Sequence, residues 1–512
     1  MKTLESSAKS LVALSMLLLS ACASTSFDVV QDSSFAIPAS ENTRLGGLRI
    51  EMDELDASGE SVFLPLSRGD ESLGARLQLI DAAEESIDLQ YFLMKDDVIG
   101  ALISAKLLQA ADRGVRVRFL LDDIFTTIRD VDLFVLNEHE NIEVRLFNPI
   151  ARRGWAYLNY AWSFSIANRR MHNKSFTVDG AFTIVGGRNL AAEYFSLKDD
   201  TEFFDLDVLA SGPIVDEIAV SFDDFWNFSK ALGIEHLQDK PSAEELKNAR
   251  ETIQSALSGD SAEIYRAAVE STSLSQLLDG GAGEFVATAD LIAELPDKLL
   301  LPVSDGSKRL IRVLGEYLRG ARHEILMVTP YFIPTSEGME FYRSIREKGV
   351  TVRLITNSLG STNHVPVHAA YERYRRGMLE MGVEIYETRA DAFQGLDADS
   401  ESRQQSTLHT KLIVIDRRYV FIGSLNLDPR SIKINTEIGV MIDSPELATE
   451  LLRDIEDGFD REVYRLELED GQTIVWHGHY KGEPVELTRN PQASWWRHFT
   501  ANFYRVLPEG QL

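Results

Sequence analysis

Met171-His172-Asn173-Lys174 and Leu408-His409-Thr410-Lys411 open two copies of one pattern. In both copies the His-x-Lys pair is followed, after four residues, by an aspartate, which is Asp179 in the first and Asp416 in the second. Six residues later both copies continue with a Gly-Gly or Gly-Ser pair, one further residue and an asparagine: Gly186-Gly187-Arg188-Asn189 and Gly423-Ser424-Leu425-Asn426. One His-x-Lys pair proves little, but two copies with the same spacing indicate an internal repeat.

The repeat extends on both sides of these motifs. Equivalent stretches occur in the same order in both halves: Ile87–Phe92 with Met327–Phe332, Arg113–Arg118 with Lys348–Arg353, and the segment starting at Asp205 with the one starting at Glu437. The chain is therefore a duplicated domain.

Hydrophobic spacing predicts an α/β fold for each half. In the first, we expect a strand at Ile87–Phe92, a helix at Ile99–Arg113 and a strand at Val115–Leu121. The second repeats this order at Glu324–Phe332, Gly338–Lys348 and Val350–Ile355. A helix between two strands implies a crossover connection, and therefore a largely parallel or mixed sheet.

A strand-turn-strand hairpin is predicted after each His-x-Lys pair. The predicted strands are Ser175–Val178 with Phe182–Val185, and Leu412–Ile415 with Tyr419–Ile422. Each His-x-Lys pair is therefore expected to begin a strand, with its two side chains on the same face.

The remaining segments differ in composition, which divides the chain of 512 residues into six parts. We expect a signal peptide, a tether, a first domain, an acidic linker or outer excursion, a second domain and a C-terminal extension, at residues 1–21, 22–44, 45–235, 236–300, 301–470 and 471–512. The extension carries Trp476, Trp495 and Trp496. These tryptophans either pack internally, or the pair at 495–496 touches lipid headgroups.

The N-terminus has the pattern of an export signal, with Lys2 and Lys9 before the apolar run Leu11–Leu19. Leu19-Ser20-Ala21-Cys22 resembles the bacterial lipobox, in which the cysteine is lipidated and holds the protein at a bilayer. The alternative is an ordinary signal peptide or an uncleaved anchor. The resemblance implies an envelope lipoprotein, and Ala23 after the cysteine slightly favours the outer membrane over the inner one.

Composition excludes several functions. The 80 acidic and 52 basic residues give a formal charge of −28, which argues against a broad nucleic-acid-binding surface. Because Cys22 is the only cysteine, no intrachain disulfide and no cysteine-based zinc site can form. We expect neither a metal nor a cofactor.

The paired motifs suit chemistry at a phosphodiester. A neutral imidazole is a competent nucleophile at phosphorus, and a second, protonated imidazole can donate a proton to the leaving alcohol. Two lysines and two asparagines can hold the non-bridging oxygens without a metal. A two-step reaction follows, in which a phosphohistidine is resolved by a second alcohol or by water.

These motifs resemble those of the phospholipase D superfamily, and more closely its cardiolipin synthase C-like branch. The stretches that carry the resemblance are Asn168–Lys174, Gly186–Asn189 with Glu193–Phe195, Thr356–Thr362, Tyr371–Arg376, and Leu507-Pro508 with Leu512. The resemblance implies two phospholipase D-like αβα domains paired about a pseudo-twofold axis, with the active site at their interface.

The resemblance also implies roles for the repeated residues. His172 is the expected nucleophile and His409 the acid-base, although the near-symmetry of the repeat leaves their order open. Lys174, Lys411, Asn189 and Asn426 are expected to bind phosphate. Asp205 and Glu437 are expected to orient the histidines. Asp179 and Asp416 belong to the catalytic motif but are expected to brace it, and Ser424, where the first copy has Gly187, adds a hydrogen bond to phosphate or to the other half.

The sequence says less about the substrate than about the reaction. The arginines flanking the motifs either bind phosphate headgroups or balance nearby acids: Arg169, Arg170, Arg188, Arg373, Arg375 and Arg376. Aromatic residues between Trp155 and Phe164 form a lipid-facing loop or a buried lid.

The expected function is cardiolipin synthesis from phosphatidylglycerol and a second phospholipid, either phosphatidylethanolamine or another phosphatidylglycerol. The alternatives are a hydrolase that releases phosphatidic acid, a nuclease and a non-catalytic scaffold. A small partner protein is compatible with the sequence.

Overall fold

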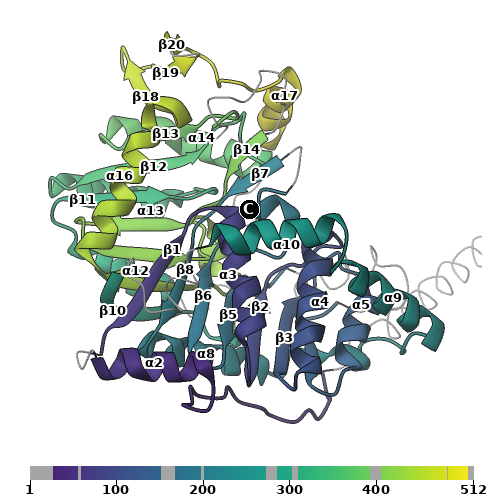
Figure 1. The fold of residues 1–512 in the computed structure, drawn as a ribbon. Helices are drawn as coiled ribbons and strands as arrows, with labels where there is room; N and C mark the ends of the chain where they lie inside the picture. The colour runs from purple at the N-terminus through teal and green to yellow at the C-terminus, as the bar shows by residue number, and fades with distance from the viewer. Residues whose placement is uncertain are drawn as a thin grey trace, which may run out of the picture.

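The structure, a computed structural model, describes residues 27–55, 59–150, 168–197, 201–272, 285–302, 309–392, 405–480 and 483–505. The signal peptide, Cys22 and the aromatic stretch 155–164 lie outside these ranges. Figure 1 shows the second half of the chain, in green and yellow, above and to the left of the first half.

The first half forms a mixed sheet flanked by helices. Its strands are β1 (Ser61–Leu66), β2 (Ser86–Tyr91), β3 (Arg116–Asp122), β4 (Ile142–Phe147), β5 (Ser175–Val178), β6 (Phe182–Gly186), β8 (Asp207–Ser211) and β9 (Ala231–Gly233). Its helices are α2 (Arg44–Leu55), α3 (Gly69–Ala82), α4 (Val98–Asp112), α5 (Asp130–Asn137) and α8 (Pro213–Trp226).

The second half repeats this arrangement. Its strands are β10 (Phe285–Ala293), β11 (Glu324–Val328), β12 (Thr351–Asn357), β13 (Glu384–Thr388), β15 (Leu412–Ile415), β16 (Tyr419–Gly423), β17 (Ile438–Asp443), β18 (Val463–Glu469), β19 (Thr473–Tyr480) and β20 (Glu483–Leu487). Its helices are α12 (Arg309–Gly320), α13 (Thr335–Glu347), α14 (Val365–Glu380), α15 (Pro429–Lys433), α16 (Pro445–Glu462) and α17 (Trp495–Tyr504).

Strand pairing links both halves into one sheet of 18 strands. The pairings run β9-β4-β3-β2-β5-β6-β8-β1 through the first half and β10-β17-β16-β15-β11-β12-β13-β18-β19-β20 through the second. The crossover pairs β2–β3, β3–β4, β11–β12 and β12–β13 are parallel. The predicted mixed α/β sheet is therefore confirmed in both halves.

The segment 236–300, predicted as an acidic linker or an outer excursion, packs against both halves. Helices α9 (Ala243–Ser255) and α10 (Asp260–Ser271) bury Ala249, Ile253 and Ala268 in the core of the first half. Residues 285–287 of β10 pair with β1, and residues 288–293 pair with β17. β10 therefore joins the two sheets and occupies the place in the second half that β1 has in the first.

Residues 27–43 do not behave as a free tether. The backbone N–H of Ala36 donates to the carboxylate of Asp223 at 2.9 Å, and Gln31 Nε2 donates to the carbonyl of Ala231 at 2.7 Å. The described part of the expected tether is thus bound to α8 and β9 of the first half.

The two predicted hairpins lie at the expected residues, as β5–β6 and β15–β16. Both turns are tight, with positive φ at Asp179 (50°) and Gly180 (60°) and at Asp416 (53°) and Arg417 (53°). This pair of left-handed residues is the type I′ geometry that matches strand twist. The prediction is wrong in one detail, because the strands begin one residue after Lys174 and Lys411, so each His-x-Lys pair precedes its strand.

Candidate active site

A cavity of about 510 Å³ lies between the two halves. His172 and Asn189 line it from the first half, and His409 and Asn426 line it from the second. The two motifs, which are separated by 237 residues in sequence (409 − 172), therefore meet at one site.

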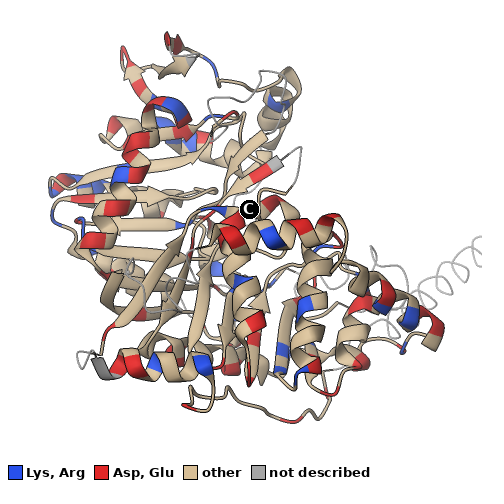
Figure 2. Cartoon of the chain, in the orientation of Figure 1, with Lys and Arg blue, Asp and Glu red and all other residues tan. Residues whose placement is uncertain are grey.

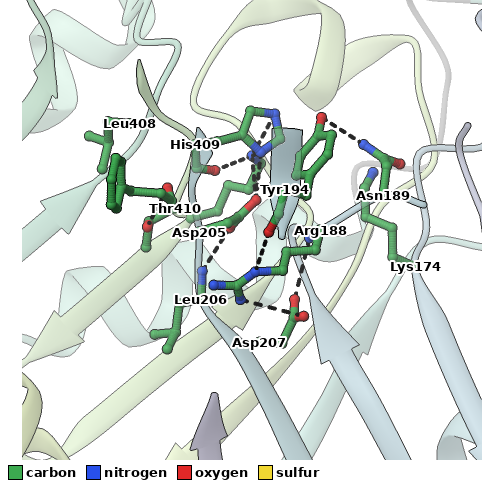
Figure 3. A network of polar contacts seen from close by, with 12 residues as sticks. Lys174, Arg188, Asn189, Tyr194, Asp205, Leu206, Asp207, Leu408, His409 and Thr410 are labelled. Carbon is green, nitrogen blue, oxygen red and sulfur yellow. Dashed lines mark hydrogen bonds and ion pairs between the residues drawn. The ribbon is translucent and has the colours of Figure 1, made fainter. Parts of the chain in front are cut away.

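Each histidine is held by the carboxylate of the opposite half. His172 Nδ1 lies 2.8 Å from Glu437 Oε2, and His409 Nδ1 lies 2.6 Å from Asp205 Oδ2. Figure 3 shows His409 directed toward Asp205. A carboxylate on Nδ1 fixes that nitrogen as the N–H and leaves Nε2 with a lone pair.

The backbone repeats this exchange between the halves. The N–H of His172 donates to the carbonyl of Thr436 at 3.0 Å, and the N–H of His409 donates to the carbonyl of Phe204 at 2.7 Å. Thr436 and Phe204 each precede the carboxylate residue that holds the same histidine. A short parallel pair, β7 (Thr201–Phe204) with β14 (Gln405–Leu408), leads into the second of these contacts. Main chain and side chain therefore fix each imidazole from across the interface.

Both imidazoles are neutral near pH 7. Burial lowers the pKa of His172 to about 4, against the opposing effect of Glu437. Burial also lowers the pKa of His409 to about 3, and the positive charge of Lys411 acts in the same direction. A phosphodiester anion in the cavity would favour the charged imidazolium and so raise both values.

The two lysines lie behind the histidines. Lys174 Nζ donates to the carbonyl of His172 at 2.6 Å, and Lys411 Nζ donates to the carbonyl of His409 and lies 2.7 Å from its Nδ1. Burial lowers the pKa of Lys174 to about 7 and that of Lys411 to about 8. When protonated, these amino groups supply positive charge beneath the cavity without lining it.

The two asparagines carry unused hydrogen-bonding capacity. Asn189 Nδ2 donates to Tyr194 Oη at 2.9 Å, while Asn189 Oδ1 and Asn426 Oδ1 are buried with no hydrogen-bond partner among the described residues. Buried polar atoms are normally paired, so unpaired amide atoms beside the histidines indicate a ligand site. Rotation of the Asn189 amide would let Tyr194 donate to Oδ1 and turn the amide N–H groups toward an anion.

Asp179 and Asp416 lie outside the cavity, at the far ends of β5 and β15 from the histidines. Asp179 accepts backbone N–H groups from residues 84–86 at 2.9–3.1 Å, and Asp416 accepts those of residues 322–324 at 2.7–3.0 Å. Each carboxylate ties its hairpin to the loop before a central strand.

Ser424 contacts a protein carboxylate. Its hydroxyl donates to Glu437 Oε2 at 2.5 Å. At the equivalent Gly187, an added Cβ would lie 2.2 Å from Asp205 Oδ1. The shorter aspartate therefore packs against a glycine, whereas the longer glutamate accepts a hydrogen bond from a serine.

Most of the flanking arginines bind the protein itself. Arg170 pairs with Asp122 at 3.2 Å, Arg188 with Asp207 at 3.5 Å and Arg375 with Glu387 at 2.8 Å. Arg169 and Arg376 donate to backbone carbonyls. The interpretation in which these arginines balance nearby acids therefore holds for Arg170, Arg188 and Arg375.

Several cavity residues were not anticipated from the sequence. The rings of Phe92, Tyr194 and Phe203 contact the two histidines at centroid distances of 4.8–5.5 Å. Glu193 and Arg430 also line the cavity, and both stand four residues after the asparagine of their motif. An acid in one copy thus faces the same cavity as a base in the other, and aligning the repeat beyond the asparagine would have shown this asymmetry.

Both halves of the chain match one protein family. A family described as "Cardiolipin synthase, PLD-like domain" matches residues 77–226 and 314–458. Cardiolipin synthase C of Escherichia coli is 36% identical over 463 residues, which cover 88% of this chain and 96% of that protein. Cardiolipin synthase 1 of Bacillus anthracis is 26% identical over 77% of this chain and 65% of its own length.

The fold is also similar to a solved structure. Phosphatidylserine synthase from Haemophilus influenzae superimposes with a TM-score of 0.54 at 13% identity, covering 90% of this chain and 97% of that one. Within the described residues, no helix has both the length and the apolar composition needed to cross a bilayer. From the two matched repeats and the 36% identity, the chain belongs to the cardiolipin synthase family of phospholipase D-like proteins.

Proposed function

We propose that this protein is a phosphatidyltransferase that makes cardiolipin from phosphatidylglycerol and a second phospholipid. The observation that carries the proposal is the pair of histidines in one cavity, each held by the carboxylate of the opposite half. The family relationship, and the name of the relative in Escherichia coli, support the choice of product.

His172 is the proposed nucleophile. Its pKa of about 4 keeps the ring neutral at physiological pH, and Glu437 holds the Nδ1 proton, so the Nε2 lone pair is free for attack. Attack forms an N–P bond and breaks the P–O bond to the first headgroup alcohol. His409, protonated in the presence of the bound anion, gives its proton to that leaving oxygen.

In the second step His409 acts as a base, and His172 is the leaving group. The hydroxyl of a second phospholipid loses its proton to His409 and attacks phosphorus, which breaks the N–P bond and restores neutral His172. Lys174, Lys411, Asn189 and Asn426 are the proposed groups that stabilise charge on the phosphoryl oxygens. Water in place of the alcohol would give phosphatidic acid.

The proposed location is the bacterial envelope, with an N-terminal lipid on Cys22 holding the enzyme at a membrane. The basis is the lipobox-like sequence, and the outer membrane is slightly favoured by Ala23. Labelling with a radioactive fatty acid should modify the wild type and leave Cys22→Ser unmodified. Fractionation of the two membranes then assigns the compartment.

Lipid mass spectrometry tests the function. Cells lacking their own cardiolipin synthases would express the wild type, His172→Ala or His409→Ala. We expect cardiolipin with the wild type and with neither variant. A rise in phosphatidic acid instead would identify a hydrolase, and an unchanged lipid profile with folded protein would contradict the proposal.

Intact-protein mass spectrometry tests the assignment of the two histidines. His409→Ala lacks the acid of the first step as well as the base of the second, so the test uses a donor whose leaving group needs no proton, phosphatidyl-p-nitrophenol. With this donor a phosphatidyl adduct on His172 should accumulate. An adduct on His409 in the His172→Ala variant would reverse the assignment.

A further inference from the structure

Helix α17 exposes an aromatic face to solvent. Trp495, Trp496, Phe499 and Phe503 keep 74%, 62%, 51% and 63% of their surface exposed. Their spacing places them on one side of the helix. Phe499 stacks on both tryptophans, at centroid distances of 5.6 and 5.3 Å. Large exposed apolar patches of this kind mark interaction sites.

The charge around this face differs from that of the whole protein. The chain has a formal charge of −28, yet residues 488–505 include Arg489, Arg497 and Arg505 and no aspartate or glutamate. Figure 2 shows blue and no red on α17, whose sequence holds one arginine and no acidic residue. Arg505 is paired with Glu372 at 2.6 Å and Arg497 is bonded to backbone carbonyls, so the segment adds little free positive charge. Because it carries no acidic residue, it does not repel anionic headgroups, and exposed tryptophan is typical of the headgroup region.

The opposite side of α17 is fixed to the rim of the catalytic cavity. Arg497 donates to the carbonyls of Leu359 and Thr362, at 2.9 and 2.7 Å, and to Gln405 Oε1 at 2.9 Å. Thr362 precedes two cavity-lining residues, Asn363 and His364.

Two further contacts strengthen this connection. Ala501 packs with Leu359 and Ala369 in a small buried cluster. Gln405 begins β14, the strand that ends directly before His409. Figure 1 shows α17 above β14 and β7. The aromatic face and the catalytic histidine are therefore parts of one connected unit.

We propose that α17 docks into the interface of an anionic phospholipid bilayer and so turns the cavity toward the lipid headgroups. The inference rests on the proposed function, because only a lipid substrate requires the cavity to face a membrane. Tryptophan is the residue typical of that interface.

A bilayer fits this face better than a second copy of the chain. The exposed aromatic side chains amount to roughly 500 Å². A stable protein interface needs about 800 Å² on each partner.

Fluorescence quenching tests insertion. The full-length protein, carrying Cys22→Ser so that no acyl chain contributes, would be mixed with vesicles of phosphatidylglycerol and acyl-brominated phosphatidylcholine. We expect quenching of tryptophan emission, and loss of most of it in Trp495→Phe/Trp496→Phe, which keeps the aromatic face but removes these two of the six tryptophans. Equal quenching in both proteins would overturn the proposal.

Binding and activity give a second test. In the same background, Trp495→Ser/Trp496→Ser should partition at least about tenfold more weakly onto the vesicles, since two large apolar side chains lose their burial. Val220→Ser/Leu300→Ser is the matched control, because both residues are similarly exposed (63% and 56%) on other elements. The control should bind as the parent does.

The activity readout separates docking from catalysis. The tryptophan variant should lose activity on vesicle lipids by the same factor and keep its activity on a monomeric short-chain phosphatidylglycerol. An equal loss on both substrates, or a dimer in light scattering that the variant abolishes, would overturn the proposal. Vesicle binding measured with His172→Ala needs no turnover, so it tests docking even if the proposed function fails.

Discussion

The carboxylates that hold the histidines differ by one methylene, and the residues beside them compensate. Glu437 accepts from both His172 and Ser424, while Asp205 packs against Gly187, where no Cβ fits. The two halves thus reach the same imidazole geometry with different side chains. Asymmetry of this kind allows one histidine to act as nucleophile and the other as acid-base.

Glu437→Gln should lower kcat by about 10–100-fold, as is typical when the partner of a functional histidine is changed. The amide can present an N–H to His172 Nδ1 and so favour the wrong tautomer. Asp205→Asn should act similarly through His409. Transfer rates with saturating lipid measure the effect, and circular dichroism checks the fold. Retention of wild-type kcat in either variant would show that the carboxylate has no part in orienting its histidine.

Gly187→Ala should impair transfer more than Ser424→Ala. The new methyl group would lie 2.2 Å from Asp205 and displace it from His409. The serine variant adds no atoms and removes the hydrogen bond to Glu437 and the acceptor of the Ile438 N–H. Loss of that bond should cost about 1–3 kcal/mol because Glu437 is buried. Comparing kcat of the two variants under the same conditions decides the order, and equal effects would contradict it.

At the scale of elements, the motif aspartates support hairpins. Asp179→Ala and Asp416→Ala would each leave three backbone N–H groups without their acceptor. We expect each to lower the free energy of unfolding by roughly 2–4 kcal/mol. Activity per folded molecule should change much less than in the histidine variants. Urea unfolding and assays on the folded fraction measure both; a loss of kcat without a loss of stability would assign these residues to the chemistry instead.

The elements predicted correctly from the sequence are those marked by nearby residues, such as a turn or a glycine at a helix end. The hairpins after His-x-Lys and the helix ending near Gly114 lie within one or two residues of their predicted bounds. Strand β10 is not predicted from the sequence, because it forms a strand by pairing with β1 and β17, which are distant in sequence. The residues around it are acidic and rich in glycine, which does not indicate a strand.

Side-chain partners distant in sequence explain the remaining differences. Arg170, Arg188 and Arg375 look like phosphate ligands in sequence because their acidic partners lie elsewhere in the chain. The repeat identified the two histidines and two asparagines of the cavity wall, but only the fold shows that each carboxylate holds the histidine of the other half. The alignment of one repeat on the other can be read from the sequence, whereas the contacts between the two halves depend on tertiary packing.

At the scale of the whole molecule, the site exists only because two halves bury it together. Burial keeps two imidazoles neutral, with pKa values near 4 and 3 against an ordinary 6.5. In the unfolded chain the same groups bind protons as the pH falls below 6.5, while in the folded chain they do not. The unfolded state then holds more protons, so folding stability must fall as the pH is lowered from about 7 toward 4.

This linkage gives a prediction that does not depend on identifying the substrate. Each histidine should contribute up to about 1.4 kcal/mol of lost stability per pH unit over that range. His172→Gln/His409→Gln removes both groups, so its unfolding free energy should decline less steeply between pH 7 and pH 5 than that of the wild type, whatever its absolute stability. Urea titrations at several pH values measure both slopes. Parallel slopes would mean that the histidines titrate normally in the folded protein, and that the interface does not exclude water from them as the buried geometry requires.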